Sequence, residues 1–196
     1  WIWNTETGEK LLYPTNGKNN EIKLKLPRAT SIILVFDSES EGEKYQQVGF
    51  GKEGKELTGA WQLQLNHING EKRKITFDAL SNLIENKETK EFAGEVIYEK
   101  TINVNAEKYQ YIDLGNVQGI SELTLNGTRI GTKWYGAHVY DISSALQNGE
   151  NKLSIKLTTI IGNYLKSLKD NQVAMNWTRR QPYYSMGIMG PVKLYI

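Results

Sequence analysis

A hairpin signal lies at the centre of the stretch Leu123-Thr124-Leu125-Asn126-Gly127-Thr128-Arg129-Ile130-Gly131-Thr132. Asn126 and Gly127 both tolerate the positive φ angles that a two-residue β-hairpin turn needs, and strand-forming residues lie on both sides of them. We therefore predict two strands, over 120–125 and 128–130, that are joined by this turn.

Further short strands are predicted on both sides of this hairpin. Trp61, Leu63 and Leu65 alternate with polar residues, which is the pattern of a strand with one buried face. Similar patterns predict strands over 74–77, 96–104, 109–114, 138–142, 152–159 and 192–196. Single helical turns are expected over 78–83, capped by Asp78, and over 143–146, capped by Asp141. No helical pattern of greater length lies between the strands. The chain is therefore predicted to be an all-β sandwich or barrel.

The first 40 residues are expected to belong to a separate structure. They contain four short strand patterns, over 1–3, 10–13, 21–26 and 31–36, too few for an independent domain. The apolar run from Ser31 to Phe36 predicts a strand buried on both faces. The domain prediction is strands from the end of a preceding β-sandwich over 1–40, a linker over 41–57, and the main domain over 58–196. Because the chain begins with Trp1 and carries no signal peptide, it is expected to be a piece of a longer protein.

Composition excludes several classes of protein. The chain has 24 Lys and Arg against 22 Asp and Glu, without a basic stripe, so nucleic acid is not an expected partner. Its longest apolar run is far shorter than the ~20 residues that cross a bilayer, so no membrane partner is expected. There is no cysteine, and His67 and His138 lack ligand spacing, so we predict no metal and no cofactor.

The acidic residues give no sign of a catalytic pair. A glycosidase needs two carboxylates facing one sugar-sized cleft. The candidates by residue type are Glu95, Glu99, Asp113, Glu122 and Asp141. None of them lies in a motif that separates it from an ordinary strand or turn carboxylate, so the sequence predicts no catalytic residue.

Two aromatic and polar segments are the candidate ligand-binding sites. The first contains Trp134, Tyr135 and His138, and the second contains Trp177, Arg179, Arg180, Tyr183 and Tyr184. Aromatic faces pack on the C–H surfaces of sugars while polar groups bind the hydroxyls, and an arginine can bind a sugar carboxylate. These side chains are therefore predicted to contact carbohydrate. Two alternatives stay open, namely contact with another domain and plain packing at the ends of the sandwich.

Four ordered signals resemble a known family. They are the strand Phe92 to Ile102, the segment Tyr111 to Val117, the hairpin Leu123 to Thr132, and Tyr140 to Leu146 followed by Asn148 to Leu153. Their order and spacing resemble the sugar-binding domain of glycoside hydrolase family 2, over about residues 58–196. Residues 3–9, 31–36 and 187–194 resemble segments of family 106 α-L-rhamnosidase-like enzymes. Asn163-Tyr164-Leu165 departs from the family's Asn-Arg-Leu segment at its second position.

The resemblance implies both a fold and a role. The fold would be a jelly-roll β-sandwich of the galactose-binding type. The role would be that of a non-catalytic accessory region of a periplasmic or secreted bacterial glycoside hydrolase, partnered by the catalytic domain of the parent enzyme and by plant or host glycan. Alternatives are an autonomous carbohydrate-binding module, a protein-interaction or adhesion sandwich, and a free-standing enzyme. An exposed platform formed by Trp134, Tyr135, Trp177 and Tyr184 would favour the carbohydrate-binding module.

Overall fold

The computed structural model divides the chain into two compact units, Trp1–Gly49 and Phe50–Ile196. It describes residues 1–5, 8–13, 22, 24, 31–38, 41–45 and 54–196. The strand predicted over 21–26 falls mostly outside these residues, as does most of a short strand that the sequence suggests over 45–50. The two units are described separately below.

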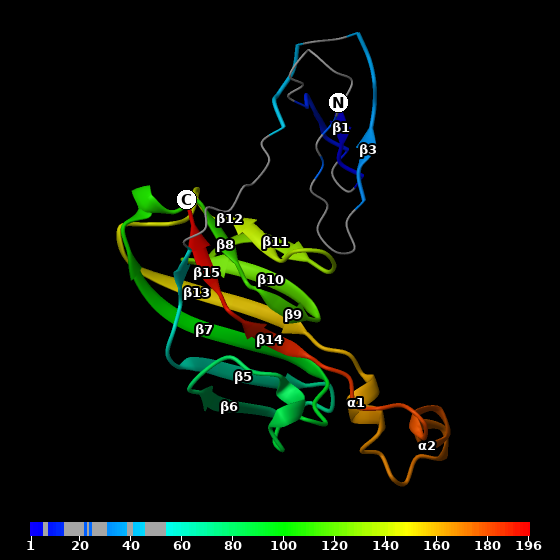
Figure 1. Cartoon of the computed structure of the whole chain (residues 1–196). Helices are drawn as coiled ribbons and strands as arrows, with labels where there is room; N and C mark the ends of the chain where they lie inside the picture. Colours follow the sequence, from blue (N-terminus) through cyan, green and yellow to red (C-terminus); the bar gives the residue numbers. More distant parts are fainter. Residues whose placement is uncertain (6–7, 14–21, 23, 25–30, 39–40, 46–53) are drawn as a thin grey trace. The chain divides into compact units, whose positions relative to one another are not determined.

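The first unit contains a three-stranded antiparallel sheet with the order β2-β1-β3 (Figure 1). Its strands are β1 (Ile2–Trp3), β2 (Lys10–Leu11) and β3 (Ile33–Leu34). The prediction that 31–36 is buried on both faces is wrong, because Ile33 is 47% exposed and Phe36 is 80% exposed. An apolar run shows that a strand is present, but burial on both faces also needs a covering layer on each side.

The second unit is built on a six-stranded antiparallel sheet with the order β11-β10-β13-β7-β5-β6 (Figure 1). Its strands are β5 (Trp61–His67), β6 (Lys72–Phe77), β7 (Gly94–Val104), β10 (Ile120–Leu125), β11 (Thr128–Lys133) and β13 (Gly149–Thr158). A sheet of this size can bury a face only if another layer packs against that face.

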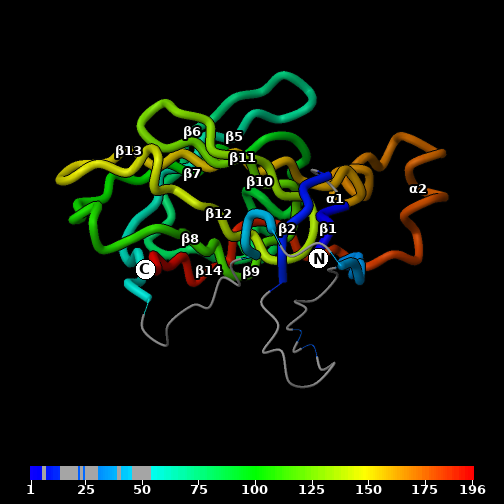
Figure 2. The backbone as a smooth tube through the Cα atoms, turned by 90° about the horizontal axis from the view of Figure 1, so that it is seen from above, coloured from blue at the N-terminus to red at the C-terminus, as the bar shows by residue number. Residues whose placement is uncertain are grey.

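A second layer covers one face of this sheet, as the view from above shows (Figure 2). It contains a four-stranded sheet, β12-β8-β15-β4, and a two-stranded sheet, β14-β9. The strands are β4 (Lys55–Glu56), β8 (Tyr111–Asp113), β9 (Asn116–Gln118), β12 (Val139–Asp141), β14 (Gly187–Gly190) and β15 (Lys193–Tyr195). The predicted all-β sandwich is thereby confirmed. Strand β4 lies inside the segment predicted as a linker.

The core between the layers follows the predicted alternation. Trp61, Leu63 and Leu65 of β5 are at most 1% exposed, and Val96 and Tyr98 of β7 are fully buried. Between them, Gln62 is exposed, and Gln64 and Ile97 are half-buried, so each of these strands has one face in the core and one face toward solvent. Burial of one large apolar side chain contributes about 1.5–3 kcal/mol.

The Asn126-Gly127 turn is confirmed and is attached to a second turn by a buried asparagine. Asn126 and Gly127 have φ angles of 52° and 80°. The Asn126 side chain donates to the Oδ1 atom of Asn151 at 2.8 Å and accepts from the backbone of Lys152. Asn151 is fully buried, and it also donates to the carbonyls of Gln147 and Gly149. Asn151 therefore fixes the Asn126-Gly127 turn relative to the turn over residues 147–151.

The helical elements differ from the prediction. The expected turn over 78–83 is absent, and a 3-10 helix, η1 (Leu83–Glu85), follows instead with Asn82 as its cap. Asn82 accepts a bond from Ile84, a role that the sequence pattern assigned to Asp78. A second 3-10 turn is η2 (Ala106–Lys108). Two short α-helices, α1 (Gly162–Leu165) and α2 (Gln172–Thr178), lie between β13 and β14.

Candidate functional site

The first candidate segment joins β11 to β12 and carries an exposed aromatic pair. Trp134 is 67% exposed, and its ring meets Tyr135 edge-on at 4.6 Å between centroids. A single exposed indole beside a tyrosine offers a small apolar surface of the kind on which a sugar ring packs.

His138 is not part of this surface. It is 4% exposed, and its Nδ1 atom lies 2.5 Å from the hydroxyl of Ser121. That hydroxyl lies 2.7 Å from the Tyr140 hydroxyl, which donates to the Ser121 carbonyl. Because Ser121 belongs to β10 and Tyr140 to β12, this cluster links the two layers. The prediction that His138 contacts carbohydrate does not fit its burial.

Burial also determines the protonation of His138 and Tyr140 in this cluster. It lowers the pKa of His138, with a further lowering by Lys133 and an opposing effect of Asp113. Burial raises the pKa of Tyr140 to about 12, although bonds from Ser121 and the Lys133 backbone oppose it. Both side chains are therefore neutral near pH 7, which suits a dry contact between sheets.

The second candidate segment is a helical insertion, residues 159–186, which a buried asparagine holds at its base. Asn163 accepts from the Tyr184 backbone at 2.9 Å and donates to the carbonyl of the same residue at 2.8 Å. Lys166 donates to the carbonyls of Thr178, the last residue of α2, and of Gln181, which follows it. In the sequence, Asn163 stands out only through the family resemblance, because an asparagine that bridges two distant segments leaves no local pattern.

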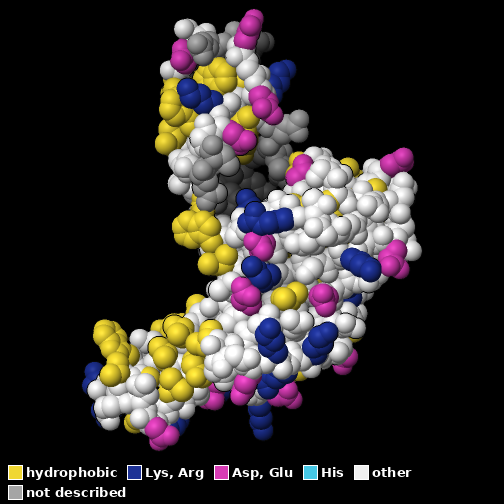
Figure 3. Space-filling model, turned by 180° about the vertical axis from the view of Figure 1, so that it is seen from behind, with side chains coloured by type: hydrophobic (Ala, Val, Ile, Leu, Met, Phe, Trp, Pro, Cys, Tyr) yellow, Lys and Arg dark blue, Asp and Glu magenta, His cyan; other side chains and the backbone are white. Residues whose placement is uncertain are grey.

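Exposed apolar side chains gather over α1 and α2 (Figure 3). Trp177 is 73% exposed, Val173 66% and Met175 42%. Val173 and Trp177 are four residues apart, so they lie on the same side of α2. Ala174 and Thr178, one position further along the helix, form the adjacent side and are buried. We call Val173 and Trp177 the α2 face; Met175 projects from the other side of the helix. Contiguous exposed apolar surface of this kind marks an interaction site.

The polar residues of the insertion divide into two groups. Tyr183 donates to Glu91 at 2.6 Å, and the ammonium of Lys90 lies 4.2 Å from its ring, so it helps to fix the base of the insertion. Arg179 and Arg180 are exposed, and within the described part of the chain neither forms an ion pair. Trp177 lies in helix α2, where the sequence pattern predicts no helix.

The predicted aromatic residues therefore fall on two segments. Trp134 and Tyr135 contact each other after β11, while Trp177 and Tyr184 belong to the insertion. No ring contact between the two pairs is found in the described residues. The structure thus offers two separate aromatic surfaces.

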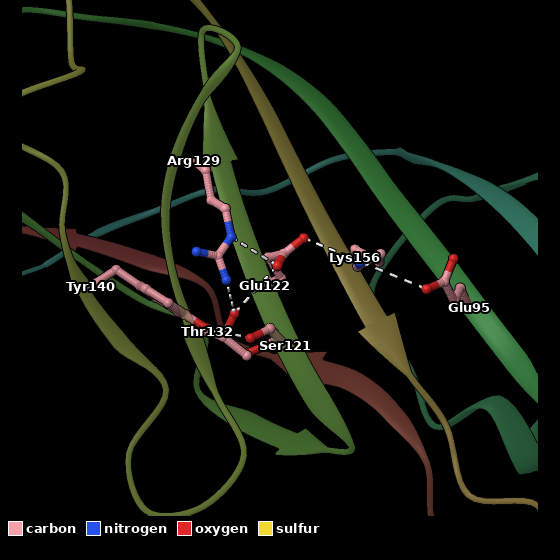
Figure 4. A network of polar contacts seen from close by, with 7 residues as sticks. All are labelled: Glu95, Ser121, Glu122, Arg129, Thr132, Tyr140 and Lys156. Atoms are coloured by element: carbon pink, nitrogen blue, oxygen red, sulfur yellow. Dashed lines mark hydrogen bonds and ion pairs between the residues drawn. The ribbon is translucent and has the colours of Figure 1, made fainter. Parts of the chain in front are cut away.

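The outer face of the six-stranded sheet carries an ion-pair network (Figure 4). Glu122 accepts from Arg129 at 2.9 Å and lies 3.2 Å from the ammonium of Lys156, which also lies 3.6 Å from Glu95. These partners lower the pKa of Glu122, with hydrogen bonds from Arg129 and Lys156 as the main causes. Two of the sequence candidates for a carboxylate pair are thus bound to one lysine on an open surface.

The carboxylate of Asp141 serves a turn. It accepts from the Ser143 backbone at 2.9 Å, which confirms the predicted cap, and from the Ser143 hydroxyl. Burial alone would raise its pKa, but hydrogen bonds from Ser143 and Gln110 lower it overall. A general acid of a glycosidase needs a raised pKa, so neither Glu122 nor Asp141 has the electrostatics of that role.

No group of three or more acidic or histidine side chains could hold a metal ion in the described part of the chain. Among the same residues, no helix has the length and apolarity to cross a membrane.

Comparisons with known proteins point to glycoside hydrolases. No family model matches the chain. A putative β-glucuronidase of Formosa agariphila is 31% identical over 133 residues, which make up 64% of this chain and 11% of that protein. The solved rhamnosidase from Novosphingobium sp. PP1Y has a TM-score of 0.66 and 23% identity, over 83% of this chain and 17% of that one. A β-glucuronidase from Ruminococcus gnavus gives a TM-score of 0.47 at 19% identity, over 55% of this chain and 22% of that one.

The chain is therefore similar to glycoside hydrolases in sequence and in fold. The likeness covers most of this chain but a small part of each enzyme, 11% of the putative β-glucuronidase and 17% of the rhamnosidase.

Proposed function

We propose that this chain is a non-catalytic accessory β-sandwich region of a bacterial glycoside hydrolase. The observation that carries this proposal is the 133-residue match to 11% of a putative β-glucuronidase, since a segment of that size is one domain of a large enzyme. The finer identity, a jelly-roll of the galactose-binding type related to family 2 and family 106 enzymes, rests on the four ordered sequence signals.

The proposed mechanical role is to brace the catalytic domain through the α2 face. Val173 and Trp177 form an exposed apolar surface on an insertion whose base is held by Asn163 and Lys166. Interfaces between domains of one chain are rich in large aromatic residues. The partner is the remainder of the same enzyme, because about nine-tenths of the related putative β-glucuronidase lies outside the match.

The decisive experiment compares one double variant in two settings. Val173→Ser with Trp177→Ser should leave the thermal midpoint of the isolated chain unchanged, because both side chains already face solvent. In the longer enzyme that contains this stretch, the same double variant should lower the midpoint by about 4 °C or more, since it removes an apolar contact. Ile68→Ser, at a residue 53% exposed outside the insertion, is the matched control and should have no effect in either setting.

Two results would overturn the proposal. One is an equal effect of the double variant in the isolated chain and in the longer enzyme. The other is turnover of p-nitrophenyl β-D-glucuronide or p-nitrophenyl α-L-rhamnoside by the isolated chain, which would make it an enzyme in its own right.

An autonomous carbohydrate-binding module is the second candidate, and the exposed Trp134–Tyr135 pair favours it. A glycan-array screen of the isolated chain tests this function. Binding that Trp134→Ala abolishes would support it, and a chain that binds no glycan would contradict it. A protein-interaction sandwich would bind no glycan and would show no effect of the α2 face on the longer enzyme.

A further inference from the structure

A hollow lies on the outer, solvent-facing side of the six-stranded sheet. It has a volume of about 440 Å³ and is lined by the outward-facing polar side chains of Gln62, Glu99, Thr101, Lys152 and Ser154. Lys100 and Leu153, which also border it, pair with each other and belong to the core-facing side of the sheet. Pockets for small molecules have volumes of about 300–1,000 Å³. The hollow belongs to neither of the two aromatic surfaces.

The strand register explains why these side chains meet. Gln62 of β5 pairs with Glu99 of β7, and Glu99 pairs with Ser154 of β13, so the three form one row across the sheet. Thr101 pairs with Lys152 in the next outward-facing row. Adjacent strands lie about 4.8 Å apart, so the two rows bring polar groups from neighbouring strands side by side on one surface.

The five outward-facing polar side chains have their hydrogen-bonding groups available, unlike the ion-pair network on the same face. Further along the sheet, Glu95 and Glu122 are paired with Lys156 (Figure 4). In the described part of the chain, by contrast, Glu99 and Lys152 form no ion pair, and the side chains of Gln62, Thr101 and Ser154 make no hydrogen bond.

We propose that this hollow binds a segment of a neutral oligosaccharide. A carboxylate, an amide, two hydroxyls and an ammonium supply both donors and acceptors, which is what the hydroxyls of a sugar need. The charges of Glu99 and Lys152 cancel, so the hollow has no net preference for a charged ligand. Figure 3 likewise shows acidic and basic side chains interspersed over the second unit rather than segregated. The choice of carbohydrate as ligand class rests on the proposed function; the location rests on the hollow alone.

The test is an NMR titration of the ¹⁵N-labelled whole chain with four neutral oligosaccharides, xylohexaose, cellohexaose, laminarihexaose and mannohexaose. At least one of them, at up to about 20 mM, should shift the backbone amides of β5, β7 and β13 that surround the hollow. Thr101→Ala should weaken that binding about fivefold, the loss expected for one hydrogen bond. Thr158→Ala is the matched control, because Thr158 is an exposed threonine at the far end of β13.

Three results would overturn the inference. None of the four oligosaccharides shifts these amides, or the shifts are confined to the segments around Trp134 and Trp177, or Thr101→Ala and Thr158→Ala weaken binding equally. These results leave the accessory role intact, because that role is tested separately by the α2-face variants in the longer enzyme.

Discussion

His138 shows at the scale of single residues how burial changes the role of a side chain. It was a candidate ligand residue by type and position, yet it is buried against Ser121 and Tyr140 between the two layers. Each hydrogen-bond donor of the cluster has an acceptor when the Nδ1–H of His138 donates to the Ser121 hydroxyl and that hydroxyl donates to the Tyr140 hydroxyl. The Tyr140 hydroxyl then donates to the Ser121 carbonyl.

We predict that His138 makes the chain less stable in mild acid. Its pKa is lowered in the folded state, mainly by burial, from the ordinary value of 6.5. As the pH falls below 6.5, the unfolded chain therefore takes up a proton before the folded chain does, and the free energy of unfolding decreases until the folded pKa is passed. Urea unfolding at about pH 7.5 and about pH 5 should show a smaller decrease for His138→Gln than for the unchanged chain.

Ser121→Ala is the control for this prediction. It removes the hydrogen-bond partner of His138 but keeps the titrating group, so it should lower stability at both pH values and keep the decrease between them. An equal decrease in the unchanged chain and in His138→Gln would show that another group is responsible.

At the scale of strands, Gly115 allows two segments of the second layer to approach each other closely. It lies between β8 and β9 and forms a parallel bridge with Gly190, which ends β14. Its φ angle is +69°, and a Cβ atom there would lie 2.6 Å from the carbonyl carbon of Gly190 and 2.6 Å from the Pro191 carbonyl oxygen. The backbone of residues 190–191 can therefore lie against Gly115 only because this position has no side chain.

We predict that Gly115→Ala destabilises the second unit more than Gly149→Ala does. Both glycines have positive φ, but nothing lies within 4 Å of a Cβ atom built on Gly149. Gly149→Ala should cost about 1 kcal/mol from backbone strain, and Gly115→Ala about 2–4 kcal/mol because a steric clash adds to that strain. Thermal unfolding of the two variants measures the difference, and equal losses would contradict the close approach.

At the scale of the whole molecule, nearly all of the buried core among the described residues belongs to the second unit. Among the described hydrophobic residues of the first unit, Ile2 alone is buried, whereas the sandwich of the second unit encloses Trp61, Tyr98 and many aliphatic side chains. Burial of apolar surface is the main stabilising contribution to folding, so the two units are expected to differ in how far they fold alone.

We predict that a fragment spanning residues 50–196 folds by itself. Its thermal midpoint should lie within about 4 °C of the midpoint for the sandwich in the whole chain, the change expected for about 1 kcal/mol in a domain of this size. Circular dichroism of the fragment and of the whole chain makes this comparison. A fragment without a cooperative transition would show that the first unit is needed for folding.

The sequence by itself determined the local structure of this protein. Alternation of apolar and polar residues predicted the buried face of β5, and Asn126-Gly127 predicted the hairpin between β10 and β11. Both signals act between residues close together in the chain. The same reasoning placed the Asp141 cap correctly. It failed at Asp78, where Asn82 provides the cap instead, because several polar residues in one turn compete for that role.

Only the tertiary structure decided which predicted residues reach the surface together. It buried His138, separated Trp134 from Trp177, and exposed Phe36 despite its apolar run. It also assembled Gln62, Glu99 and Ser154 into one row from three strands. The register of strands distant in the chain sets these neighbours, and that register depends on packing across the whole sandwich.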